Sequence, residues 1–264
     1  MPLDTSSTRC IGVFDSGVGG LSVLNALRHR LPQAPLVYLG DVAYAPYGER
    51  DSADVIARSH RIVAQLAALG ARLIVVACNT ATVLGIDAMR QRWPALRFVG
   101  VEPGVKPAVA ATRTGRVAVM ATPATAASAR LRHLIDEFAP GVQVHVEPCP
   151  ALASIIERGM HEGPELLAVL APSCLNIRAA NADIVVLGCT HYPFVANAIQ
   201  GLLGDKISLI DTATAVAERA ATVWDQGDDQ ASLRVLSTGV VEPMAALLER
   251  CSHLEHARVE HLPI

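Results

Sequence analysis

The chain has 264 residues, of which 51% are hydrophobic and 18% charged, and its formal net charge is −3 at pH 7. This composition excludes an intrinsically disordered protein, because such chains combine low hydrophobicity with a high net charge. The small negative charge and the 4% aromatic content provide neither a basic surface nor many stacking platforms, so no nucleic-acid partner is expected.

The predicted elements alternate along the chain between strands and helices. Short apolar runs rich in β-branched residues predict strands buried on both faces, at residues 10–14, 36–39, 73–77, 98–101, 116–121, 142–146, 183–187 and 207–210. Helical patterns lie between them, at residues 20–30, 52–69, 81–92, 125–138, 164–179 and 194–203. This alternation predicts an α/β fold with mainly parallel sheets, built from right-handed crossover units and flanked by helices.

Part of this pattern occurs twice. Residues 73–80 resemble residues 184–191, since each is an apolar strand that ends in cysteine and leads into a polar helix start. Residues 11–15 parallel residues 117–121 in the same way. Both pairs are offset by roughly 110 residues, which predicts two related lobes. The alternative is the general likeness of any two α/β strands.

The repeat also predicts where the lobes divide. Residues 1–103 and the returning tail 211–264 are expected to form the first lobe, and residues 104–210 the second. The Pro- and Gly-containing segment 102–107 is a natural connection between them. The tail is too short for a third lobe, so it is expected to complete the first.

The N-terminal segment and the cysteines predict a reducing compartment. Residues 1–9 do not resemble a secretory signal, and no apolar run approaches the roughly 18 residues of a membrane span. We therefore expect a cytoplasmic protein with no membrane partner, whose cysteines are thiols. None pair as Cys-x-x-Cys, which argues against a zinc ribbon or a redox motif. The six are Cys10, Cys78, Cys149, Cys174, Cys189 and Cys251.

Three chemically capable side chains lie at the predicted strand ends. Asp15, Cys78 and Cys189 each end a strand and precede a helix start, which is where open parallel sheets bind ligands. Asn79 and Thr80 are good capping residues, so Cys78 is expected beside a helix N-terminus, where amide groups and the helix dipole lower a thiol pKa. The alternative is that each cysteine is a small buried hydrophobe. We expect the other four cysteines to be such filler.

Two thiols on facing walls of one cleft have three possible uses. A disulfide is disfavoured in a reducing compartment. A metal site with His191 lacks the usual ligand spacing. Proton transfer needs two bases on opposite sides of a carbon acid, and a duplicated lobe supplies them. Asp15 and His191 are placed to tune the two thiols.

Five segments resemble the glutamate racemases of the aspartate/glutamate racemase family, in the family's order and over almost the whole chain. They are residues 14–23, 45–48, 77–82, 100–104 and 187–193. The resemblance implies two pseudo-symmetric flavodoxin-like lobes with the active site in the cleft between them. It implies cofactor-independent interconversion of L- and D-glutamate, for peptidoglycan synthesis, by a homodimer.

The resemblance also implies the roles of individual residues. Cys78 and Cys189 match the two catalytic bases, Asp15 and His191 the groups that assist them, and Glu157 a second-lobe carboxylate in a looser motif. Around Thr122 the chain departs from the family, with Ala121 where glycine is usual and Leu131 where an aromatic residue often occurs. The positions that match substrate contacts are Ser16, Tyr47, Gly48, Asn79, Thr80, Thr122, Thr125 and Thr190.

No cofactor or metal is expected. A pyridoxal cofactor requires a Schiff-base lysine, and neither Lys106 nor Lys206 lies in a motif that indicates one. The glycine-rich segment 16–20 lacks the dinucleotide-binding spacing. Because about nine residues precede the first strand, activation by a peptidoglycan precursor through an N-terminal extension is not predicted.

Two alternatives stay open. A related racemase or decarboxylase for aspartate or another carbon acid would use the same fold. A two-lobed protein that binds an amino acid without chemistry would have no need of opposed thiols.

Overall fold

The computed structural model describes residues 9–225, 230–254 and 256–264, so most of the N-terminal segment lies outside the described residues. Its strands form two sheets, and all the strand pairs described are parallel. The first sheet has the order β10 (Val259–His261), β9 (Ser232–Ser237), β2 (Pro35–Gly40), β1 (Cys10–Asp15), β3 (Ala71–Val76) and β4 (Arg97–Gly100). The second has the order β6 (Gln143–Pro148), β5 (Arg116–Ala121), β7 (Ile184–Leu187) and β8 (Ser208–Ile210).

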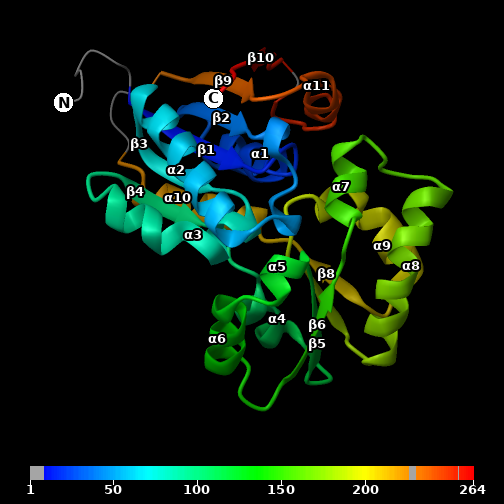
Figure 1. Ribbon diagram of the computed structural model, residues 1–264. Helices are drawn as coiled ribbons and strands as arrows, with labels where there is room; N and C mark the ends of the chain where they lie inside the picture. Colours follow the sequence, from blue (N-terminus) through cyan, green and yellow to red (C-terminus); the bar gives the residue numbers. More distant parts are fainter. Residues whose placement is uncertain (1–8, 226–229, 255) are drawn as a thin grey trace.

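The predicted α/β class and the internal repeat are confirmed by this topology. The run β2-β1-β3-β4 of the first sheet has the same order as β6-β5-β7-β8 of the second, which is the flavodoxin-like arrangement. β9 and β10, from the tail 211–264, extend the first sheet beyond β2. Figure 1 shows the first sheet and its helices above the second. The exact lobe boundaries 1–103, 104–210 and 211–264 stay a prediction.

Helices cover both faces of each sheet. The first sheet lies between the apolar faces of α1, α10 and α11 on one side and those of α2 and α3 on the other. The second lies between α7, α8 and α9 and the pair α4 and α6. This double cover explains why the strands read as continuous apolar runs. The bounds are α1 Leu21–Arg30, α2 Ser52–Ala68, α3 Asn79–Arg92, α4 Val105–Ala111, α5 Pro123–Ala126, α6 Ala129–Phe138, α7 Leu152–Glu157, α8 Pro164–Ala179, α9 Ala196–Leu203, α10 Ala213–Val223 and α11 Glu242–Leu248.

Some predicted bounds are wrong. The helix expected at residues 125–138 is two helices, because the Ser128 hydroxyl accepts a hydrogen bond from the Leu131 amide and starts α6 afresh. The helix expected at 194–203 follows a short 3-10 helix, η3 (Tyr192–Val195). Two further 3-10 helices, η1 (Val42–Tyr44) and η2 (Tyr47–Glu49), lie between β2 and α2. Within the described ranges, no helix is long and apolar enough to cross a membrane.

The polypeptide passes very close to itself where β7 ends. The Gly188 amide donates a hydrogen bond to the Met120 carbonyl at 2.8 Å, and a Cβ built on Gly188 would lie 2.6 Å from that oxygen. A side chain at this position therefore forces the strand ends apart. Because Cys189 follows directly, the glycine also fixes how close the thiol stands to β5.

We expect Gly188→Ala to lower the free energy of unfolding by about 1–3 kcal/mol, the usual cost of overpacking. Urea denaturation measures the change. The matched control is Gly201→Ala on α9, where nothing lies within 4 Å of the added Cβ. It should raise stability by about 0.5–1 kcal/mol, because alanine loses less backbone entropy in a helix. An unchanged denaturation midpoint for Gly188→Ala would contradict this account of the close approach.

Candidate active site

Cys78 links a buried strand to a helix start, as expected. It follows β3 and is the N-cap of α3, and its sulfur accepts a hydrogen bond from the Ala81 amide at 3.4 Å. Only 4% of the residue is exposed. The helix N-terminus that was predicted beside this thiol is therefore present.

The helix start lowers the pKa of Cys78 as predicted, but the expected net lowering is wrong. Burial raises the pKa of the Cys78 thiol well above its ordinary value, and the nearby Asp15 carboxylate raises it further. The Ala81 amide lowers the pKa by less than burial raises it. One hydrogen bond at a helix end does not offset the loss of water around a charged sulfur. Cys78 is a neutral thiol at neutral pH.

Cys189 occupies the equivalent place in the second sheet. It follows β7, and its sulfur lies 3.5 Å from Nδ1 of His191. The residue is 5% exposed. The polar partner of the Cys189 sulfur is therefore an imidazole, whereas the partner of the Cys78 sulfur is a backbone amide.

Both sulfurs line one small cavity, to which the two sheets contribute. Its volume of about 10 Å³ is room for roughly one water molecule. Asp15, Thr125, Tyr47 and Glu157 do not line it. The lining residues are Ser16, Pro46, Gly48, Cys78, Asn79, Thr80, Thr122, Ala153, Cys189, Thr190 and His191.

Asp15 is a fully buried carboxylate that joins the two sheets. It ends β1 and accepts hydrogen bonds from the Gly17 amide and the Thr190 hydroxyl, each at 2.9 Å. Burial raises its pKa, and the neighbouring His191 opposes that rise. Since Thr190 follows Cys189, this bond fixes the position of the second thiol relative to the first sheet.

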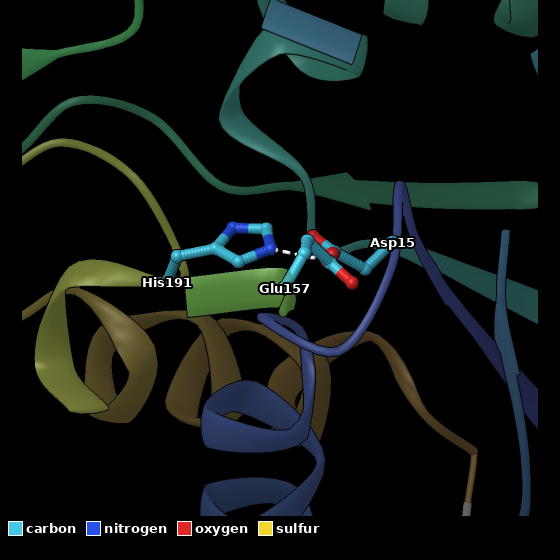
Figure 2. A group of neighbouring side chains, drawn as sticks. All are labelled: Asp15, Glu157 and His191. Carbon is cyan, nitrogen blue, oxygen red and sulfur yellow. Dashed lines mark hydrogen bonds and ion pairs between the residues drawn. The ribbon is translucent and has the colours of Figure 1, made fainter. Parts of the chain in front are cut away.

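The buried His191 pairs with the partly buried Glu157, as Figure 2 shows. The His191 ring points at Glu157, which ends α7, with Nε2 to Oε1 at 2.5 Å. The same carboxylate oxygen accepts the Val18 amide at 2.8 Å. Burial alone would lower the pKa of His191, but the neighbouring Cys189 and Glu157 side chains raise it well above its ordinary value. The imidazole is therefore held between a carboxylate and a sulfur, and both favour its protonated form.

The three side chains of Figure 2 meet a distance test for a metal site. One ligand atom from each of Asp15, Glu157 and His191 lies within 4.8 Å of the others. These atoms already have protein partners: Asp15 accepts from Gly17 and Thr190, and Glu157 accepts from Val18 and His191. We interpret the cluster as two carboxylates that each accept a hydrogen bond from the other half of the molecule, and we call the hydrogen-bonded series Glu157–His191–Cys189 the relay.

Hydroxyl groups gather on one wall of the cavity. The Thr80 hydroxyl lies 3.0 Å from that of Thr122, which lies 3.1 Å from that of Thr125. Asn79 is buried beside them, and neither its amide nitrogen nor its carbonyl oxygen has a hydrogen-bond partner. An unpartnered buried amide is costly, so this side chain is suited to a polar ligand. Thr125 does not line the cavity, and its hydroxyl lies within hydrogen-bond distance of those of Thr122 and Thr80.

Tyr47 lies differently from the expectation of a substrate contact. Its side chain is buried, and its hydroxyl donates to Asp41 at 2.6 Å, away from the cavity. Its neighbours Pro46 and Gly48 line the cavity instead. Pro46 and Ala153 were missed because apolar lining residues have no signature in a single sequence. The unpartnered amide of Asn79 was likewise visible only in three dimensions.

The remaining four cysteines lie away from this cavity. Burial raises the pKa of Cys149 to about 12, and those of Cys10, Cys174 and Cys251 to about 11. All four are free thiols within the apolar clusters around the sheets. They are packing residues, as the sequence predicted.

A family model described as Asp/Glu/hydantoin racemase matches residues 21–220. The glutamate racemase of Roseiflexus sp. (strain RS-1) is 41% identical over 97% of this chain and 98% of its own length. That of Pseudomonas aeruginosa (strain UCBPP-PA14) is 46% identical over 81% of this chain and 80% of its own.

Solved structures agree. A glutamate racemase isoform from Bacillus anthracis superposes with a TM-score of 0.87 at 28% identity, covering 99% of both chains. The Escherichia coli glutamate racemase, solved with L-glutamate and the activator UDP-MurNAc-Ala, gives 0.85 at 30% identity over 97% of this chain and 98% of its own. The chain therefore belongs to the Asp/Glu/hydantoin racemase family and, within it, to the glutamate racemases, which are amino-acid racemases.

Proposed function

We propose that this racemase inverts glutamate with two cysteine bases and no cofactor. One thiolate removes the α-proton from one face of the substrate while the opposed thiol delivers a proton to the other. The observation that carries the proposal is that Cys78 and Cys189, from equivalent positions of the two sheets, line the same cavity. A protein that only binds an amino acid has no use for this pair.

The substrate itself helps to generate the first thiolate. Burial holds Cys78 in its neutral form, and glutamate carries an ammonium group on the carbon that reacts. A positive charge within a few ångströms favours the charged form of a buried thiol. The proton that leaves Cys78 passes to the neighbouring Asp15 carboxylate, whose own pKa is raised by burial. Substrate binding and thiol activation are thus one event, and Cys78 stays unreactive until glutamate is in place.

The hydroxyl wall and the relay then stabilise the negative charges that develop in the transition state. Removing the α-proton builds negative charge next to the α-carboxylate, and hydroxyl and amide donors stabilise it without a fixed cation. Thr80, Thr122 and Asn79 supply such donors. His191, whose protonated form Glu157 favours, supports the negative charge of Cys189 when that thiolate acts as the base.

Substrate entry requires the two halves of the site to part. The cavity is about one water molecule in volume, and glutamate is several times larger. Several of the contacts that close it are single hydrogen bonds between the sheets, such as Thr190 to Asp15 and Val18 to Glu157. Closure around glutamate excludes water from the reacting carbon.

The biological role is inferred from the same chemistry. The glutamate racemase of Francisella tularensis was solved with D-glutamate and superposes with a TM-score of 0.83 at 26% identity over 97% of both chains. We propose that this chain makes D-glutamate, for peptidoglycan. Assembly as a homodimer stays a prediction, which analytical ultracentrifugation checks.

Serine substitutions test the two bases. In heavy water, wild-type protein should convert each enantiomer to its mirror image with deuterium at Cα, followed by polarimetry and NMR. Cys78→Ser and Cys189→Ser should each reduce racemisation by at least about a hundredfold, because a hydroxyl is a far weaker base than a thiolate. Cys174→Ser, a buried thiol outside the cavity, is the control and should keep wild-type turnover. Full activity in either active-site variant would refute the two-thiol mechanism.

The relay is tested by removing one charge. Glu157→Gln leaves His191 without its anionic partner, so kcat/KM should fall by about ten- to a hundredfold, the value of a hydrogen bond to a charged group. The second sheet offers a matched control in Glu147, which is buried and 2.9 Å from Nε2 of His145. Glu147→Gln should leave kcat/KM unchanged. Equal effects of the two substitutions would show that only stability was lost.

The pH dependence follows from the raised pKa of Cys78. Its thiolate fraction in the free enzyme rises tenfold with each pH unit, so kcat/KM should increase between about pH 6.5 and 8.5. The two enantiomers have equal free energies, so kcat/KM should be the same in both directions at every pH. Stopped assays from each enantiomer check both statements, and a profile that is flat over this range would contradict them.

A further inference from the structure

A buried ion pair lies behind the segment that carries Pro46 and Gly48. We call residues 41–51, between β2 and α2, the cavity loop; they include η1 and η2. The Asp41 carboxylate is fully buried, and it accepts hydrogen bonds from three different parts of the chain. Arg58 on α2 donates from Nη2 at 2.7 Å and from Nε at 2.8 Å. The Thr238 hydroxyl, after β9, donates at 2.8 Å.

The fourth donor is the cavity loop itself. The Tyr47 hydroxyl donates to Oδ2 of Asp41 at 2.6 Å, the same oxygen that Nε of Arg58 contacts. Burial and the Asp41 charge raise the pKa of Tyr47 well above its ordinary value, so the phenol keeps its proton and donates. Arg58 also donates from Nη1 to the Ile264 carbonyl at 2.8 Å. The guanidinium is therefore held from two sides, and its orientation is set.

The other side of the loop contacts the second half of the active site. A Cβ built on Gly48 would lie 2.6 Å from the Cβ of Thr122, so the loop backbone touches the hydroxyl wall directly. Glu49 accepts a hydrogen bond from the Ser154 hydroxyl at 2.9 Å. A shift of the loop by a few tenths of an ångström thus moves the cavity wall or breaks its contact with Thr122.

We propose that the Asp41–Arg58 pair, acting through the Tyr47 hydroxyl, is a positioning device that holds the Pro46–Gly48 backbone against the substrate end of the cavity. The inference rests on the proposed racemisation of glutamate. Tyr47, Asp41 and Arg58 do not line the cavity, so none of them is a catalytic residue. Their role is to fix a wall that the substrate contacts.

The device acts on substrate binding more than on proton transfer. The two sulfurs are held by β3 with α3 and by β7 with η3, and the cavity loop holds neither. The loop contacts the Thr122 wall, which the substrate needs in order to bind. Loosening the loop should therefore raise KM and leave kcat nearly unchanged.

Tyr47→Phe removes only the hydroxyl and is the sharpest test. We expect KM for glutamate to rise about tenfold, the loss of one hydrogen bond to a charged acceptor, while kcat stays within about twofold. Arg58→Lys keeps the charge and loses the two-nitrogen contact, and it should raise KM to a similar extent. Arg58→Gln, which loses the charge as well, should be worse than Arg58→Lys. The control is Arg234→Gln, which breaks an exposed Arg–Glu pair with Glu260 and should change neither constant.

Hydrogen exchange measured by mass spectrometry provides a readout that does not depend on turnover. Peptides that cover residues 42–50 should exchange about tenfold faster in Tyr47→Phe, and those from β9 should not. Unchanged exchange in the loop overturns the positioning proposal, whatever the wild type catalyses. Uniformly faster exchange with an unchanged KM also overturns it, because the effect is then only on stability. A wild type that does not racemise glutamate sinks the proposed function, and the exchange result still decides whether the loop is held as proposed.

Discussion

Two carboxylates, the buried Asp15 and the partly buried Glu157, each bind both halves of the molecule, and the rest of the site depends on them. Asp15 of the first sheet accepts the Thr190 hydroxyl from the second, and Glu157, beside the second, accepts the Val18 amide from the first. Each of these hydrogen bonds lies next to a side chain of the proposed chemistry. Thr190 directly follows Cys189, and Glu157 also contacts the His191 imidazole. Each carboxylate has one donor in its own half, Gly17 for Asp15 and His191 for Glu157, and a further donor that only the other half supplies. The site is therefore assembled only when the halves meet.

Enclosure has an electrostatic consequence for the chemistry. Because the closed cavity excludes water, Cys78 is not a thiolate at rest, and a buried Asp15 close by makes its ionisation harder still. In return, a charge that does enter is poorly screened and acts strongly on the sulfurs. The two thiols are also in unlike surroundings, an amide for Cys78 and an imidazole for Cys189. The two sheets thus place the cysteines at equivalent positions, but a different neighbouring group stabilises the thiolate of each one.

The segments that carry the reacting sulfurs differ from the segment that forms the cavity wall. The strand ends of β3 and β7 carry the sulfurs, and the parallel ladders around them make these positions rigid. The cavity loop has no ladder of its own, and a buried carboxylate with four donors provides an equivalent anchor. Buried ion pairs contribute little net stability, and defining one orientation is a better-supported reason for keeping one.

Much of the fold was determined locally and was therefore readable from the sequence. Strands buried on both faces appear in the sequence as continuous apolar runs. The strand–Cys–helix repeat at Cys78 and Cys189 predicted two equivalent sheets from the sequence alone. The short elements were missed or misjoined, as with the break at Ser128, because a single side-chain hydrogen bond decides where α6 begins. Such a bond has no periodicity to detect.

Other properties of the site arise from residues that lie far apart in the chain, so they could not be predicted from the sequence. The raised pKa of Cys78 is the clearest case: a capping sequence predicts a lowered value, but burial in the folded molecule reverses the sign. The direction of the Tyr47 side chain depends likewise on Asp41 and Arg58, and the Glu157–His191 pair on how α7 packs against η3. The sequence by itself determined which groups are present at the strand ends. Their distances, charge states and roles follow from desolvation and packing, which are properties of the assembled molecule.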